Sequence, residues 1–63
     1  MDWLKKLRKE QKLTQANVSE VAGISHQSYS FIETGRRKPT VRVAKRIAAV
    51  LGFEWTRFFE EGP

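Results

Sequence analysis

Side chains able to carry out catalysis or bind a metal are scarce in this sequence of 63 residues. It contains one histidine, His26, and no cysteine. A cysteine nucleophile with its base is therefore excluded, and a metal site with two histidine ligands cannot be built. The acidic residues show no ligand spacing, and there is no glycine-rich phosphate loop. The sequence predicts a protein that is not an enzyme and that binds neither a cofactor nor a metal.

The chemistry that the composition favours is the binding of an anion. Twelve Lys and Arg residues against seven Asp and Glu leave a net charge of +5. This excess favours a polyanionic partner, either nucleic acid or an anionic membrane surface. A membrane partner is not expected, because the apolar stripes are narrow and the longest apolar run, 47–51, is far below the ~20 residues that span a bilayer. The lack of cysteine is neutral about the compartment but fits a reducing cytoplasm, and the N-terminus shows no signal-peptide pattern, so the expected location is cytoplasmic.

The elements that must position these side chains are short helices separated by caps and glycines. We expect five helices, at about residues 2–11, 15–22, 26–34, 41–51 and 54–60. The expected capping side chains are Asp2, Thr14, Ser25 and Thr40. The glycines expected to end helices are Gly23, Gly35 and Gly52. Because no segment resembles a strand, the sequence predicts a compact all-α fold made of a single domain over residues 1–63.

The most informative segment is 15–34, which we interpret as a helix-turn-helix. Two helices of eight or nine residues are joined by a three-residue turn that begins at a glycine. The apolar residues fall where two such helices must touch: Val18, Ala22, Ile24, Tyr29 and Ile32. Many helical hairpins share this pattern, so the pattern alone does not establish DNA binding.

Further motifs extend the pattern beyond this segment: Leu7-Arg8, Leu13-Thr14-Gln15, Gly23-Ile24-Ser25, Ile32-Glu33-Thr34-Gly35-Arg36-Arg37-Lys38-Pro39 and Leu51-Gly52. In this order they resemble the lambda-repressor-like, or Xre-type, DNA-binding domains, and the resemblance covers residues 4–59 without an insertion. It implies a five-helix fold whose second and third helices form the helix-turn-helix. The sequence departs from the family's usual residues at Ser19, Ala22 and Tyr29, where a large ring can fill the volume that a smaller neighbour leaves.

Four residues of the third helix are expected to face DNA bases: His26, Gln27, Ser30 and Phe31. They lie opposite the side of the helix that carries Ser28, Tyr29 and Ile32. Gln27 is the strongest candidate, because a carboxamide can pair with N6 and N7 of adenine together, although a solvated polar residue is the alternative. His26 could donate to guanine or to a phosphate, or only lie near the positive end of the helix. Phe31 could contact a thymine methyl group or fold back against the basic loop of residues 36–39.

Phosphate contacts are expected from Thr14, Gln15, Arg36, Arg37 and Lys38. Gln15 opens the second helix, whose amide groups and dipole favour an anion, and the resemblance assigns the matching glutamine to the DNA backbone. The three basic residues follow Gly35, and their alternative is a solvated loop. For the lysines of the first helix, the sequence offers no positioning argument and favours a solvated face.

The resemblance also implies an ion pair between Arg8 and Glu33, which would join helices one and three. It further implies a dimer on operator DNA, and we assign the dimer interface to Trp55 and Phe58 in the aromatic C-terminal segment. The alternative for Trp55 is that it only covers the core beside Trp3. We expect the homodimer to be weak alone and to be stabilised on DNA.

The sequence as a whole favours a transcriptional regulator, most simply a repressor, that binds double-stranded DNA sequence-specifically. Its expected target is a pseudo-palindromic operator, because one domain reads too few base pairs to select a single site in a genome. The alternative is a protein-interaction module on the same fold that sequesters a related regulator through its aromatic C-terminus. A steep dependence of binding on salt would favour DNA as the partner.

Overall fold

The structure is a computed structural model that describes residues 1–60, and in this part all regular elements are helical. Four α-helices and one 3₁₀ helix follow each other: α1 (Asp2–Glu10), α2 (Gln15–Ala22), α3 (His26–Glu33), α4 (Val41–Leu51) and η1 (Trp55–Phe59). The predicted all-α class is confirmed. The fifth helix is a single 3₁₀ segment, and residues 61–63 of the predicted domain lie outside the described residues.

Side-chain caps explain where three of the helices begin. The hydroxyl groups of Thr14, Ser25 and Thr40 accept hydrogen bonds from the backbone N–H three residues later, at 3.0, 3.0 and 3.2 Å. In return, the Oδ1 of Asn17 accepts a hydrogen bond from the backbone N–H of Thr14 at 3.0 Å, which completes a capping box. The expected cap at Asp2 is wrong. Asp2 already lies in the first turn of α1. Its carboxylate can interact favourably with the helix dipole there, but it does not cap the helix.

The turn between α2 and α3 depends on Gly23, which has a φ of 75°. In this left-handed conformation its N–H reaches the carbonyl of Glu20, and the next N–H, of Ile24, reaches that of Ser19 at 3.0 Å. A side chain at this position would be strained, and its Cβ would lie 3.2 Å from a guanidinium nitrogen of Arg46. The glycine therefore sets the angle at which α3 leaves α2.

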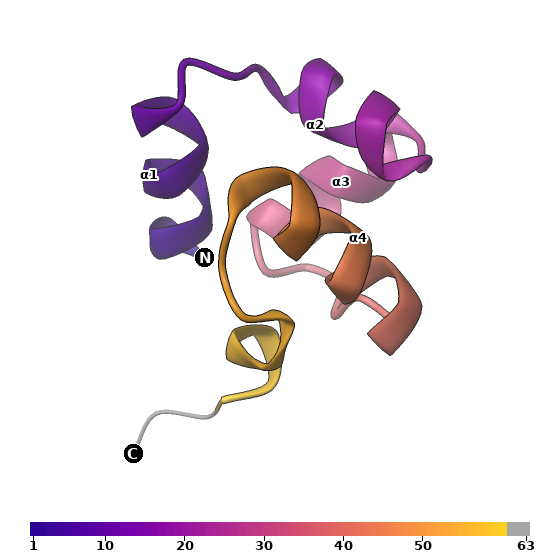
Figure 1. The fold of residues 1–63 in the computed structure, drawn as a ribbon. Coiled ribbons are helices and arrows are strands. Elements are labelled where there is room, and N and C mark those ends of the chain that lie inside the picture. Colours follow the sequence, from indigo (N-terminus) through magenta and orange to yellow (C-terminus); the bar gives the residue numbers. More distant parts are fainter. Residues whose placement is uncertain (61–63) are drawn as a thin grey trace.

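The apolar faces of the helices meet in one core. Figure 1 shows α1 to one side, α2 packed against both α3 and α4, and η1 at the end of the segment that follows α4. The buried core residues are Leu4, Val18, Ala22, Tyr29, Ile32, Ala44, Ile47, Leu51 and Phe58. Tyr29 and Ala22, two of the residues that depart from the family pattern, are both buried in this core. Among residues 1–60, no helix is long and apolar enough to cross a membrane.

Candidate nucleic-acid interface

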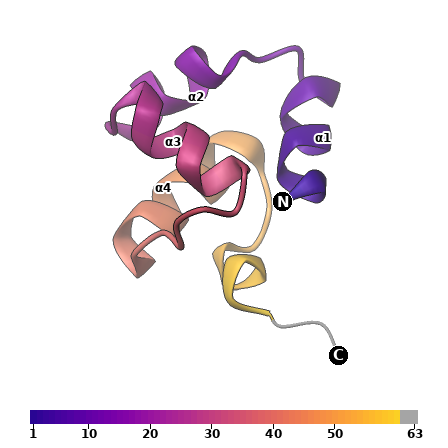
Figure 2. The same ribbon diagram turned by 180° about the vertical axis from the view of Figure 1, so that it is seen from behind.

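The outward face of α3 carries the four residues that the sequence assigned to base contacts. His26 and Gln27 are exposed, and Ser30 and Phe31 are half-buried. The opposite side of the helix packs Tyr29 into the core with none of its surface exposed. Figure 2 shows α3 on the near side of the molecule, in front of α4. The structure therefore presents this face to the outside, and its contact with DNA bases stays a prediction.

Gln15 lies at the start of α2, and both polar atoms of its carboxamide contact side chains of α3. Its Nε2 donates to Oε1 of Glu33 at 3.1 Å, and its Oε1 lies 3.1 Å from Nε2 of His26. These contacts join the start of α2 to both ends of α3. An amide NH₂ has two donors, so one N–H of Gln15 remains available to an acceptor such as a phosphate. No sequence signal indicated these bonds, because their partners are 11 and 18 residues away along the chain.

Arg8 and Glu33 form a buried, two-point ion pair between α1 and α3. Arg8 Nε donates to Glu33 Oε2 at 2.9 Å and Arg8 Nη2 donates to Oε1 at 3.0 Å. A third guanidinium nitrogen, Nη1, donates to the Leu13 carbonyl at 2.7 Å. All three guanidinium nitrogens are thus engaged inside the domain, which makes Arg8 a structural residue.

The electrostatics of this pair follow from its burial and its hydrogen bonds. Burial alone would raise the pKa of Glu33, but the hydrogen bonds that its carboxylate accepts, above all from Arg8, lower it to about 2. The hydrogen bond to Glu33 raises the pKa of Arg8. Both groups are therefore charged at neutral pH. Among residues 1–60, no group of three or more His, Cys, Asp or Glu side chains is placed to hold a metal ion.

The basic loop is built around Phe31. The carbonyl of Phe31 accepts hydrogen bonds from the backbone N–H of Arg36 and of Arg37, at 2.8 and 3.2 Å. The guanidinium carbons of the same two arginines lie 5.9 and 5.6 Å from the centre of the Phe31 ring, within the range of a cation–π interaction. Of the two alternatives for Phe31, the structure shows the contact with the loop. Arg36, Arg37 and Lys38 are all exposed.

The two residues assigned to a dimer interface have different surroundings. Phe58 is 3% exposed and packs on the rings of Trp3 and Phe53, with centroids 5.5 and 5.4 Å away. Its assignment to the interface is wrong, because the side chain is already enclosed by its own domain. Trp55 is half-buried, with Phe59 at 6.1 Å and the Lys45 ammonium 5.2 Å from its ring. Trp55, like Trp3, also packs against the core, as its alternative proposed, although its ring neighbour is Phe59 rather than Trp3.

Comparison with known proteins identifies the family. The model of the helix-turn-helix family matches residues 4–58. The chain is 51% identical to the uncharacterized HTH-type transcriptional regulator YqaF of Bacillus subtilis, over 94% of this chain and 78% of the relative. It is 35% identical to the immunity repressor protein of Bacillus phage phi105 and 29% identical to the HTH-type transcriptional regulator PuuR of Escherichia coli. These matches cover 81% and 92% of this chain, but only 35% and 31% of those relatives.

No solved structure matches the chain significantly. The family match covers most of the chain and includes α2, the turn and α3, the elements that form the outward face described above. The chain belongs to the helix-turn-helix family of lambda-repressor-like DNA-binding domains.

Proposed function

We propose that this protein is a transcriptional repressor that acts in the cytoplasm and reads a pseudo-palindromic operator by placing α3 in the major groove. The observation that carries the proposal is the outward face of α3, where His26 and Gln27 are exposed beside the start of α2. In helix-turn-helix proteins, the N-terminal residues of the second helix contact base edges. The immunity repressor of phage phi105 among the relatives supports repression as the direction of control.

The proposed phosphate contacts flank this face on two sides. On one side lie Thr14 and Gln15. The side chain of Gln15 contacts Glu33 and His26, and one of its N–H groups remains available to a phosphate. On the other side, Arg36, Arg37 and Lys38 form an exposed basic loop. Contacts to phosphates position the protein on the duplex, whereas contacts to bases select the sequence. Substitutions at the phosphate-contacting residues should therefore weaken binding to all DNA, whereas substitutions at the base-contacting residues should reduce sequence preference.

Gln27→Ala tests the base contact. We expect the variant to bind a duplex selected from random sequences more weakly by about 1–3 kcal/mol, and to lose its preference at one base pair. Gln27 is exposed and makes no capping bond, so the variant should fold normally. The measurement is the dissociation constant on the selected duplex and on one of mixed sequence. Equal losses on both duplexes would remove Gln27 from the residues that read bases.

Arg37→Ala is the matched test of a phosphate contact. We expect it to weaken binding to selected and to mixed-sequence DNA about equally, and to lower the slope of log affinity against log salt by about one. An unchanged slope would mean that the loop is only solvated. If the unmodified protein bound DNA with little salt dependence, the protein-interaction module would become the better description of the chain.

A further inference from the structure

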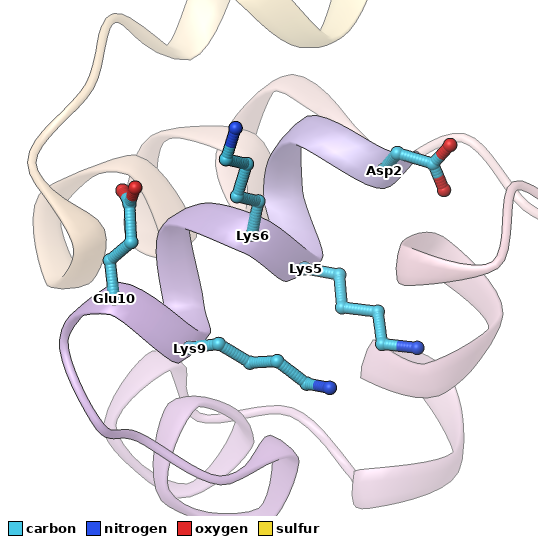
Figure 3. Close-up of a pocket in the computed structure, with 5 residues that line it drawn as sticks. All are labelled: Asp2, Lys5, Lys6, Lys9 and Glu10. Atoms are coloured by element: carbon cyan, nitrogen blue, oxygen red, sulfur yellow. The ribbon is translucent and has the colours of Figure 1, made fainter.

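The helix α1 carries exposed lysines on two different sides. Lys5, Lys6 and Lys9 line a shallow hollow along the helix together with Asp2 and Glu10. Figure 3 shows the side chains of Lys5 and Lys9 extending to the same side, whereas Lys6 and Glu10 extend to another. This separation follows from the helix itself, because residues four apart share a face. The lysines of α1 are thus not one uniform solvated face.

Of the three lysines, Lys5 and Lys9 lie nearer than Lys6 to the side of α1 that faces α3. Arg8 marks the direction of α3, because its guanidinium pairs with Glu33 at the end of that helix. At 100° per residue, Lys5 lies about 60° and Lys9 about 100° around the axis from Arg8, whereas Lys6 lies about 160° away. Lys5 is therefore the lysine nearest to the direction of α3, Lys9 lies at about a right angle to it, and Lys6 lies furthest from it.

These two lysines are also available to bind an anion. Both are exposed, and neither forms an ion pair with a carboxylate of residues 1–60. A lysine ammonium is a compact point charge on a flexible stem, so it can reach a phosphate without a fixed hydrogen-bond geometry. Two carboxylates of the same helix, Asp2 and Glu10, line the same hollow, where three lysines outnumber them.

We propose that Lys5 and Lys9 bind phosphates of duplex DNA next to the site that α3 reads, and so extend the DNA-binding surface from the helix-turn-helix onto α1. This inference rests on the proposed DNA-binding function. Contacts of this kind are independent of sequence, because the phosphates are the same at every base pair. They release condensed counterions, so each should add ~0.9 to the slope of log affinity against log salt.

The test compares Lys5→Gln, Lys9→Gln and the double variant with Lys6→Gln, a control of the same residue type, charge change and helix. The probe is a mixed-sequence duplex about three helical turns long, titrated between ~50 and ~200 mM salt. We expect each of Lys5→Gln and Lys9→Gln to lower the slope by ~0.9 and the double variant by ~1.8, while Lys6→Gln leaves it unchanged. Because all three lysines are exposed, thermal melting should show that the variants fold alike.

Two outcomes separate this inference from the proposed function. If the unmodified protein and Arg37→Ala behave as proposed above, but Lys5→Gln and Lys9→Gln match Lys6→Gln, the contribution of α1 is overturned and the DNA-binding function stands. If the unmodified protein fails to bind the duplex, the proposed function fails and this inference fails with it. If all three single variants lowered the slope equally, the loss would reflect only the lower net charge of the protein, and the inference would also be overturned.

Discussion

At the scale of single residues, Phe31 joins the outward face of α3 to the basic loop. Its carbonyl accepts the N–H of Arg36 and Arg37, and its ring lies under both guanidinium groups. The backbone bonds would survive a change of side chain, whereas the ring contacts would not. Phe31 therefore acts as a positioning residue for the two arginines, and its replacement should affect phosphate binding.

Phe31→Leu should remove the cation–π contacts and keep an apolar side chain of similar burial. Because such contacts contribute about 0.5–1 kcal/mol at exposed sites, we expect binding to fall by about 2- to 5-fold on selected and mixed-sequence duplexes alike. Phe31→Tyr keeps an aromatic ring and serves as the control. A loss confined to the selected duplex, and tied to a thymine, would show that Phe31 reads a base.

Tyr29 offers a second prediction at this scale. Its side chain is fully buried, and its hydroxyl makes no hydrogen bond of good geometry among residues 1–60, although it lies near the Glu33 carboxylate; burial and that carboxylate both raise its pKa. A buried polar group without a partner is unfavourable, so Tyr29→Phe should raise the free energy of unfolding by about 1 kcal/mol. Denaturant titration measures this change. A lower stability would show that the hydroxyl supports the neighbouring Arg8–Glu33 pair.

At the scale of the elements, the pair of Arg8 and Glu33 joins α1 to α3. The side chains are 9% and 3% exposed, so removing one partner leaves a poorly solvated charge. Arg8→Met or Glu33→Gln alone should each cost about 3–5 kcal/mol, and the double variant should cost less than the sum of the two. A double-mutant cycle measured by denaturant unfolding checks this. Strictly additive costs would show that the pair contributes no coupling.

The pair of Arg8 and Glu33 should also make the free energy of unfolding depend on pH. The pKa of Glu33 is about 2 in the folded protein and ordinarily 4.5, so the unfolded chain binds its proton first as the pH falls. The stabilisation is therefore complete above pH 4.5 and is lost between 4.5 and 2, by an amount on the order of 3 kcal/mol. Unfolding measured across this window should show the loss, and Glu33→Gln should flatten it. An equally steep curve in that variant would place the titration in other carboxylates.

At the scale of the whole molecule, the proposed binding of two copies to one operator requires a contact surface between them. With Phe58 in the core, Trp55 is the remaining residue of the assigned interface, and it is half-buried with Lys45 over its ring. A single small patch of this kind supports a weak homodimer, below the ~1,200–2,000 Å² of a stable interface. The dimer is then expected to form mainly on DNA, with half-sites one helical turn, ~34 Å, apart.

Trp55→Ala tests this assembly. We expect it to reduce cooperative binding to a duplex with two half-sites, because the contact between copies is lost, and to leave affinity for one half-site nearly unchanged. Gel-shift titrations on the two duplexes measure both quantities. If half-site affinity fell by the same factor, Trp55 would belong to the core of the single domain, and the interface would lie elsewhere.

What the sequence determined by itself was local. Thr14, Ser25 and Thr40 act through the backbone N–H three residues away, and Gly23 acts through its own φ. The bounds of α2 and α4 could therefore be predicted without knowing how the helices pack. The face of α3 that turns outward was also predictable, because the helical period alone separates it from the apolar side.

What only the tertiary structure decided depends on how the helices are placed against each other. The bonds of Gln15 to Glu33 and His26 join residues 18 and 11 positions apart, and no local preference encodes them. The burial of Phe58 and the stacking of Arg37 on Phe31 likewise depend on neighbours brought in by packing. The placement of α1 against α3 likewise involves the pair of Arg8 and Glu33, which lie 25 positions apart in the chain. Each of these contacts is set by the shape of the shared core, which local sequence preferences do not specify.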